Sequence, residues 1–363
     1  MFTHRRASTA RHQLLASLVL GSFLLINNSS PVFAEKENQG QAASPLNSMR
    51  VSGPYKSGNL AVYLIHGKDT APNQKLITLS EGLSKKSVVV HETSNVNELT
   101  VENLGEEAVF IQSGDIVKGG QQDRTLQYDM VLKPKSGKVA IKSFCVESGR
   151  WTQRGQESPA HFGSSPNMVS SKSLKIAAKG YANQGKVWQE VSNLQQKYKQ
   201  EQVKKRLDGA LAAPASPTSL ELTLESEPVK KLSEKYVKDI SPICAGNKDA
   251  IGYAFAINGK INSADVYASH DLFQRLWPKL VSATAQEAAS EGGDDKAPEA
   301  PAPDAVKKYL AEASAGKETK EEGPGKTISL KRESGKTYFF QSRAQMQING
   351  APDVWVHMNY LSK

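Results

Sequence analysis

Residues 143–151, SFCVESGRW, bring four kinds of side-chain chemistry within seven positions. Cys145 carries a thiol, and Glu147 carries a carboxylate that could act as a general acid or base. Arg150 could bind an anion, and Trp151 could stack on a planar group. The spacing therefore predicts either a ligand site or a strand end that is fastened by ion pairs.

A second polar stretch, QQDR at 121–124, is expected to lie beside the first. The sequence KPKSG at 133–137 is typical of a turn, so the flanking apolar runs are predicted to form a hairpin. A turn centred on Lys135 would place Asp123 opposite Glu147, and the two carboxylates would need a cation or a shared proton. A turn one residue longer would place Arg124 opposite Glu147 as an ion pair.

Two interpretations of these stretches stay open. In the first, a charge network of Arg124, Glu147 and Arg150 fastens the end of the hairpin under the Trp151 side chain. In the second, Arg124 and Arg150 bind an anionic ligand, while Gln122 and Glu147 orient it by hydrogen bonds. Asp123 or Glu147 would then be the acid–base group of any reaction. A nucleophilic Cys145 is disfavoured, since no histidine lies within twenty residues before it or ten after it.

The elements that would position these residues predict an α+β protein with an antiparallel sheet or sandwich as its core. Residues 51–155 are rich in strand patterns with short turns, and residues 172–288 are rich in helical spacing. The main domain is predicted to span 51–288, followed by a low-complexity linker at 289–326 and a small β segment at 327–363. Helices are predicted at 76–86, 186–207, 226–240, 269–288 and, more weakly, 304–314; Asn258-Gly259 predicts a hairpin turn.

The start of the chain predicts export. Residues 1–34 combine a basic beginning, the short apolar run LLASLVLGSFLLI and a small-residue cleavage site after Ala34, the pattern of a secretory signal peptide. Residues 35–50 are predicted to be a disordered leader. No later stretch is apolar enough to cross a bilayer, so a periplasmic or extracellular location without a transmembrane segment is expected.

The composition argues against several classes of partner. The three arginines of the signal peptide account for +3 of the formal charge of +9, which leaves a moderate +6. The densest basic stretch, 197–206, lies in a helical pattern without interleaved aromatic residues, so no nucleic-acid partner is expected. No histidines or cysteines show metal-ligand spacing, so neither a metal nor another cofactor is predicted. Cys145 and Cys244 could form one disulfide, or Cys145 could pack as a small apolar side chain.

The stretch at 101–151 resembles the core of the ARG-and-rhodanese-phosphatase-associated protein domain, a bacterial family of uncharacterised activity. The shared features include GD at 114–115, GG at 119–120, Q-x-R at 122–124, CVE at 145–147 and GRW at 149–151. The resemblance extends over about 52–288. The family usually has Asn where this chain has Asp123, which argues against a catalytic Asp123.

The resemblance implies a shared pocket at these residues, and the family name suggests nucleotide-like or phosphorylated ligands. We therefore expect an exported ligand-binding or accessory module for a small polar or anionic ligand, with nucleotide- and sugar-like molecules as the candidates. The ligand contacts would be Gln122, Asp123, Arg124, Cys145, Arg150 and Trp151. One alternative is a hydrolase of glycosidic or phosphate-linked substrates that uses Glu147 as acid or base. The other is a structural envelope protein in which the motif is only a brace.

Overall fold

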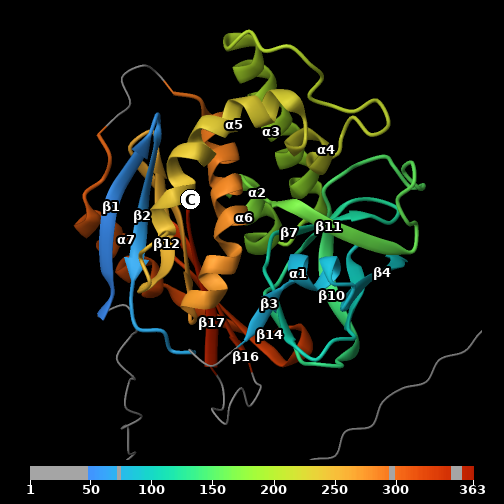
Figure 1. The fold of residues 1–363 in the computed structure, drawn as a ribbon, viewed down its shortest axis with the longest axis horizontal. Helices are drawn as coiled ribbons and strands as arrows, with labels where there is room; N and C mark the ends of the chain where they lie inside the picture. The colour runs from blue at the N-terminus through green and yellow to red at the C-terminus, as the bar shows by residue number, and fades with distance from the viewer. Residues whose placement is uncertain (1–47, 72–74, 294–298, 345–353) are drawn as a thin grey trace, which may run out of the picture. The chain divides into compact units, whose positions relative to one another are not determined.

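Eight strands from the beginning, middle and end of the chain form the largest sheet of the computed structural model (Figure 1). The structure describes residues 48–71, 75–293, 299–344 and 354–363, so the predicted signal peptide and most of the predicted leader lie outside the described residues. All neighbours in this sheet are antiparallel. The strands, in spatial order, are β1 (Arg50–Ser57), β2 (Leu60–His66), β12 (Ala250–Ile257), β13 (Lys260–Tyr267), β17 (Val354–Ser362), β16 (Thr337–Ala344), β15 (Thr327–Glu333) and β14 (Lys317–Glu322).

Nine further strands form a small closed barrel and a three-stranded sheet. The barrel strands, in order, are β10 (Gly137–Cys145), β5 (Glu98–Asn103), β4 (Val88–Asn95), β11 (His161–Met168), β7 (Asp115–Gly119) and β8 (Arg124–Leu126). The small sheet contains β3 (Leu76–Thr78), β6 (Ala108–Ile111) and β9 (Met130–Leu132), and only its β3–β6 pair is parallel. The predicted class, α+β with antiparallel sheets, is confirmed.

Each of the five predicted helices is observed near its predicted position, and two short helices, at 172–175 and 220–224, were not predicted. They are α1 (Leu79–Ser84), α2 (Lys172–Lys175), the π-helical turn η2 (Ile176–Gly180), α3 (Gln184–Lys204), α4 (Leu220–Leu224), α5 (Glu227–Ile240), the 3₁₀ turn η3 (Ser241–Cys244), α6 (His270–Glu291), α7 (Pro303–Ser314) and the 3₁₀ turn η4 (Pro324–Lys326). Among the described residues, no helix combines the length and apolar character needed to span a bilayer.

The large sheet is covered on both faces, which explains the continuous apolar sequence of β12. On one face, Tyr253 and Phe255 pack with Trp277 of α6, and α5 joins the same cluster (Figure 1). On the other face, Ala254 packs with Leu310 of α7. The sheet is therefore the middle layer between α5 and α6 on one side and α7 on the other.

The last third of the chain is more ordered than the sequence predicts. Within the predicted linker at 289–326, α7 stands where the weak helix at 304–314 was predicted, and its buried residues Val306, Leu310 and Ala313 recur at helical spacing. The same stretch also contains β14, which was not predicted. The predicted β segment at 327–363 supplies β15, β16 and β17 to the large sheet. Composition suggested a linker because alanine, glutamate and lysine dominate this stretch; its few apolar residues gain their stability from the sheet.

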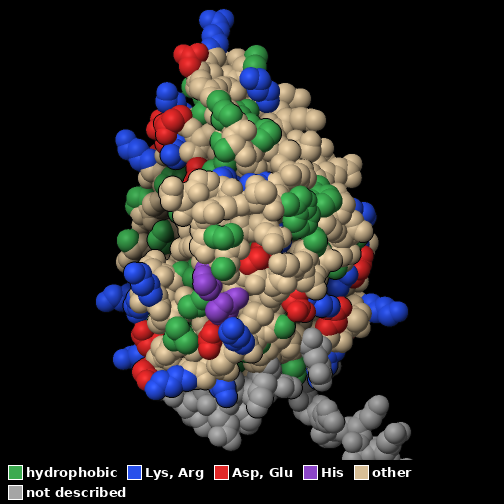
Figure 2. Space-filling model, turned by 90° about the vertical axis from the view of Figure 1, so that its right-hand side faces the viewer, with side chains coloured by type: hydrophobic (Ala, Val, Ile, Leu, Met, Phe, Trp, Pro, Cys, Tyr) green, Lys and Arg blue, Asp and Glu red, His purple; other side chains and the backbone are tan. Residues whose placement is uncertain are grey.

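The helical region also covers the barrel, and this contact positions the motif residues. Phe144 and Val146 pack with Val187, Val191 and other apolar residues of α3. Phe144 and Val146 therefore point into a core that the barrel shares with the helices. On the side of the molecule shown in Figure 2, acidic and basic side chains are interspersed around the edge, and the centre is largely uncharged.

Candidate functional site

The two predicted stretches do meet, on neighbouring strands β8 and β10 of the barrel. Cys145 pairs with Arg124, and Phe144 pairs with Thr125, so neither predicted register is right. The reason is that 133–137 does not join these two strands as a hairpin. The strand before the turn, β9, pairs with β6, whereas β10 pairs with β5 and then with β8. A turn cannot set the register of strands that it does not connect.

Glu147 and Arg150 form a buried, two-pronged ion pair. Arg150 donates from Nε to Oε1 at 2.7 Å and from Nη2 to Oε2 at 2.8 Å. Glu147 also accepts from the Ser216 hydroxyl and, at 3.0 Å, from the backbone N–H of Asp123. Burial alone would raise the pKa of Glu147, but these hydrogen bonds outweigh burial and lower the pKa below its ordinary value. The remaining Arg150 hydrogen bonds go to the carbonyls of Gly119, Gly120 and Thr152.

Asp123 forms the second pair, with an arginine that the sequence analysis missed. Arg154 donates from Nη1 to Oδ2 at 2.9 Å and from Nη2 to Oδ1 at 2.8 Å. Asp123 also accepts from Ser219 Oγ at 2.9 Å and from the Gly119 N–H at 3.0 Å. Burial would lower the pKa of Arg154, but its hydrogen bond and charge pairing with Asp123 raise it. The spacing R-x-x-x-R at 150–154 was the available sequence signal for this partner.

The other predicted site residues have different environments. Arg124 lies 3.6 Å from a carboxylate oxygen of Glu92 and donates to the Gln122 carbonyl at 2.8 Å. Its Nε atom and both amide atoms of Gln122 are buried and have no partner among the described residues. Burial raises the pKa of the Cys145 thiol to about 11. Trp151 is 47% exposed and stands apart from this buried group.

The segment 216–220, which leads into α4, covers the two ion pairs of Glu147 and Asp123. Besides the two serine contacts, Thr218 and Ser148 exchange hydrogen bonds, and the Leu220 N–H donates to the Val146 carbonyl at 2.9 Å. The Asp123 and Glu147 side chains are consequently fully buried. We call Asp123, Glu147, Arg150 and Arg154 the ion-pair group. Every carboxylate oxygen in it already accepts a hydrogen bond.

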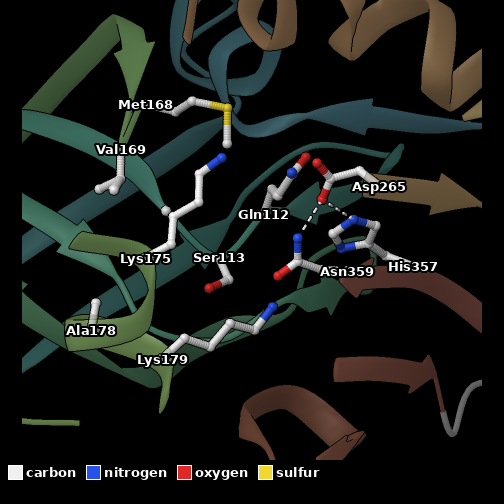
Figure 3. A pocket seen from close by; sticks show the side chains of 11 residues that line it. Gln112, Ser113, Met168, Val169, Lys175, Ala178, Lys179, Asp265, His357 and Asn359 are labelled. Atoms are coloured by element: carbon white, nitrogen blue, oxygen red, sulfur yellow. Dashed lines mark hydrogen bonds and ion pairs between the residues drawn. The ribbon is translucent and has the colours of Figure 1, made fainter. Parts of the chain in front are cut away.

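A second polar cluster, absent from the sequence prediction, lies between the large sheet and η2 (Figure 3). His357 of β17 is buried and stands between two carboxylates. Its Nδ1 atom is 2.9 Å from Asp129 Oδ2, and its Nε2 atom is 3.0 Å from Asp265 Oδ1. Asn359 donates to the same Asp265 oxygen at 2.8 Å, and the Tyr267 ring stacks on His357 at 4.5 Å.

The two carboxylates determine the charge of His357. Burial alone would lower the pKa of His357, but Asp129 and Asp265 outweigh burial and raise it. For each aspartate, burial would raise the pKa, yet nearby positive groups lower it. Because both ring nitrogens face carboxylates, His357 is an imidazolium and has no lone pair with which to act as a base. The cluster is therefore suited to electrostatic binding.

Two lysines complete this cluster, and we call the resulting cavity the lysine pocket. Lys175 directly precedes the π-helical turn η2 and Lys179 lies within it, and both side chains point into the pocket (Figure 3). Neither ammonium lies within 4 Å of a carboxylate of the described residues. The Lys179 ammonium lies instead 4.7 Å from the centroid of the Phe340 ring. The cavity measures about 20 Å³.

A second cavity, of about 80 Å³, shares Lys179 with the lysine pocket and extends toward β15 and β16. It is lined by aromatic and aliphatic surface, including Tyr128, Leu330 and Phe340. Its charged lining residues are Asp129, Lys179, Glu321 and Lys331. Within the part of the chain that the structure describes, no group of three or more histidine, cysteine, aspartate or glutamate side chains could hold a metal ion. Both cysteines in that part are free and buried.

Comparison with known proteins agrees with the resemblance seen in the sequence and extends it. The model of the ARG and Rhodanese-Phosphatase-superfamily-associated Protein domain matches residues 48–361. The match includes 327–361, which the resemblance inferred from the sequence left out, and these residues supply three strands of the large sheet. No curated protein and no solved structure matches the chain. The chain belongs to the ARG and Rhodanese-Phosphatase-superfamily-associated Protein domain family.

Proposed function

We propose that this protein is an exported module that binds a small organic anion, with the acidic group of the ligand in the lysine pocket. The observation that carries the proposal is the pair of ammonium groups, Lys175 and Lys179, that point into a cavity without a carboxylate partner among the described residues. Export is supported by the signal-peptide pattern at 1–34.

The charge balance of the pocket favours an anion. Three cations, Lys175, Lys179 and the imidazolium of His357, face two carboxylates, Asp129 and Asp265. Both carboxylates contact His357 directly, whereas Lys175 and Lys179 act on them only as nearby charges, so each ammonium group can still form a direct ion pair with a ligand. A π-helical turn such as η2 is uncommon and occurs frequently at functional sites. The net charge of these five groups is +1, so an acidic group with one negative charge would neutralise the pocket.

The volumes of the two neighbouring cavities favour a ligand with a small acidic group attached to a larger apolar or planar part. A cavity of about 20 Å³ holds little more than one water-sized group. The neighbouring cavity of about 80 Å³ could hold a planar or apolar part of the ligand, since Phe340 and Tyr128 line it. We therefore expect an organic carboxylate to bind better than inorganic phosphate.

The ion-pair group gives less support to the predicted ligand contacts and to the hydrolase alternative. Glu147 is ionised and accepts hydrogen bonds on both oxygens, so it has neither a proton to donate nor a free lone pair facing a cavity. Arg150 and Arg154 are likewise engaged with carboxylates. This geometry supports a brace for the barrel end, with ligand binding assigned to the lysine pocket.

Isothermal titration calorimetry with a panel of aliphatic and aromatic carboxylates, nucleotides and inorganic phosphate tests the proposal. Lys175→Gln and Lys179→Gln each remove one charge from the pocket, and Lys199→Gln removes one from an exposed position of α3. We expect at least one carboxylate to bind the wild type and the Lys199 variant alike, and to bind each pocket variant at least tenfold more weakly. Absence of binding by every acid, or equal binding by all four proteins, would refute the proposal.

A further inference from the structure

We propose a second ligand site, in a basin between the β12–β13 hairpin, α2 and α6, that takes a small zwitterion of the amino-acid type. This basin has a volume of about 350 Å³, within the range of small-molecule sites. It is distinct from the lysine pocket, and the two cavities share no lining residue. The basin site does not depend on the proposed function of the lysine pocket.

Two buried residues that line the basin, Glu287 and Asn262, are called its floor, and each carries one acceptor oxygen without a donor among the described residues. Glu287 of α6 is 2% exposed; its Oε1 atom accepts from the Lys172 N–H at 2.7 Å and from Asn262 Nδ2 at 2.9 Å. Its Oε2 atom has no partner among the described residues, and neither has Asn262 Oδ1. Buried carboxylate and amide oxygens almost always accept hydrogen bonds. The two side chains are neighbours, since Asn262 donates to the other oxygen of Glu287. Two unpartnered oxygens on adjacent side chains call for a group with several donors, and an ammonium group supplies three.

The charge of Glu287 supports a cationic donor in particular. Burial raises the pKa of this carboxyl despite the favourable fields of Lys175 and Lys172. A ligand ammonium group at Oε2 would favour the ionised carboxylate and would satisfy both orphan oxygens together. A neutral hydroxyl donor would supply one hydrogen bond and no charge, so it would bind more weakly.

The rim of the basin favours an acidic group on the same ligand. Of its three lysines, Lys172 donates to Ser362 Oγ at 3.0 Å, and Lys197 pairs with Glu291 at 2.6 Å. Lys260, in the first position of β13, is exposed and forms no ion pair with a described residue. A molecule with an ammonium group at the floor and a carboxylate at the rim would match both ends.

The test is calorimetric titration of the purified protein with the twenty amino acids, with methylammonium and acetate as single-charge probes. Glu287→Gln keeps the shape of the side chain and removes the charge, and Lys260→Ala removes the rim cation. Lys238→Ala on an exposed position of α5 is the matched control, and Lys179→Gln reports on the lysine pocket alone. Circular dichroism verifies that each variant is folded.

We expect at least one amino acid to bind the wild type, the Lys238 variant and the Lys179 variant with the same Kd. Binding should weaken at least tenfold in Glu287→Gln and at least threefold in Lys260→Ala. If Glu287→Gln does not fold, Asn262→Ser replaces it with the same tenfold criterion. The proposal is overturned if no amino acid binds, if binding survives the floor substitution, or if acetate or methylammonium binds as well as the zwitterion.

Discussion

The ion pair between Glu147 and Arg150 is the contact whose loss should damage the protein most. In the variant Arg150→Met, the aliphatic stem of the side chain is kept and the guanidinium is removed. Glu147 then loses two charge-assisted hydrogen bonds while it stays fully buried. The Ser216 and Asp123 contacts remain but supply no positive charge. Arg154 Nη1 lies 3.6 Å from Glu147 Oε1, but it already donates to Asp123 and does not replace the two lost hydrogen bonds.

The expected loss follows from the burial of the pair. Removing one partner of a buried ion pair costs about 3–5 kcal/mol, because the other charge stays in a region without water. Arg150 also donates to three backbone carbonyls, which lose a donor in the variant. We therefore expect Arg150→Met to lower the free energy of unfolding by about 4 kcal/mol, a large share of the ~5–15 kcal/mol of a typical protein.

Urea denaturation, followed by far-UV circular dichroism, measures this loss. The double variant Glu147→Gln, Arg150→Met removes both charges, so it should be more stable than Arg150→Met alone by at least about 2 kcal/mol. Lys199→Met, on the exposed face of α3, is the control and should change stability by less than about 0.5 kcal/mol. A loss below about 1 kcal/mol in Arg150→Met, or a double variant less stable than the single one, would show that the pair is not a buried brace.

Three further predictions concern other buried groups. Burial raises the pKa of Glu221 to about 7, and the unfolded chain loses this proton at a lower pH than the folded protein does, so the free energy of unfolding falls between about pH 4.5 and pH 7. In urea titrations, the free energy of unfolding of Glu221→Gln should equal that of the wild type at pH 5 and should be higher by about 3 kcal/mol at pH 8. Because the pKa of His357 is raised in the folded protein, its protonation stabilises the fold; this stabilisation is complete below about pH 6.5 and is lost as the pH rises through the folded-state pKa. The variant His357→Gln should therefore have a lower free energy of unfolding than the wild type at pH 6, and the difference should shrink toward high pH. Burial raises the pKa of Cys145 and of Cys244 to about 11, so a thiol reagent at pH 8 should label neither in the native protein and both in urea, and rapid native labelling would contradict their burial.

Local patterns predicted the helices well, because each helix carries its own evidence. The apolar spacing along α3 and the capping serine before α6 both lie within the segment that they describe. The turn at Asn258 and Gly259 was equally local, and both residues have the positive φ that this hairpin turn needs.

Strand pairing was predicted poorly where partners are distant in sequence. The apolar run at 124–132 looked like one strand, but it divides into β8 and β9, which join different sheets. β11 was missed because its sequence, HFGSSPNM, is rich in small and polar residues. Its buried positions follow from neighbours on β4 and β7 that no local pattern reveals.

In the candidate site, too, contacts between residues close in sequence were predicted and contacts between distant residues were not. The sequence identified Glu147 and Arg150, which lie three residues apart and do pair. It did not identify Ser216 or the lysine pocket, because their partners lie tens to hundreds of residues away along the chain. Proximity in sequence found one ion pair, and only the fold could reveal the rest.

The strand order of the large sheet sets a condition on how the chain can fold as it is made. β2 pairs with β12, about 190 residues later, and β13 pairs with β17 at the end of the chain. A chain that emerges from its N-terminus first therefore holds unpaired strands until the last residues appear. Such long-range pairing folds slowly and exposes apolar strands meanwhile. A premature stop before β17 would leave the backbone N–H and C=O groups of β13 unpaired at an open sheet edge, so truncated chains should aggregate even though they contain every residue of the ion-pair group.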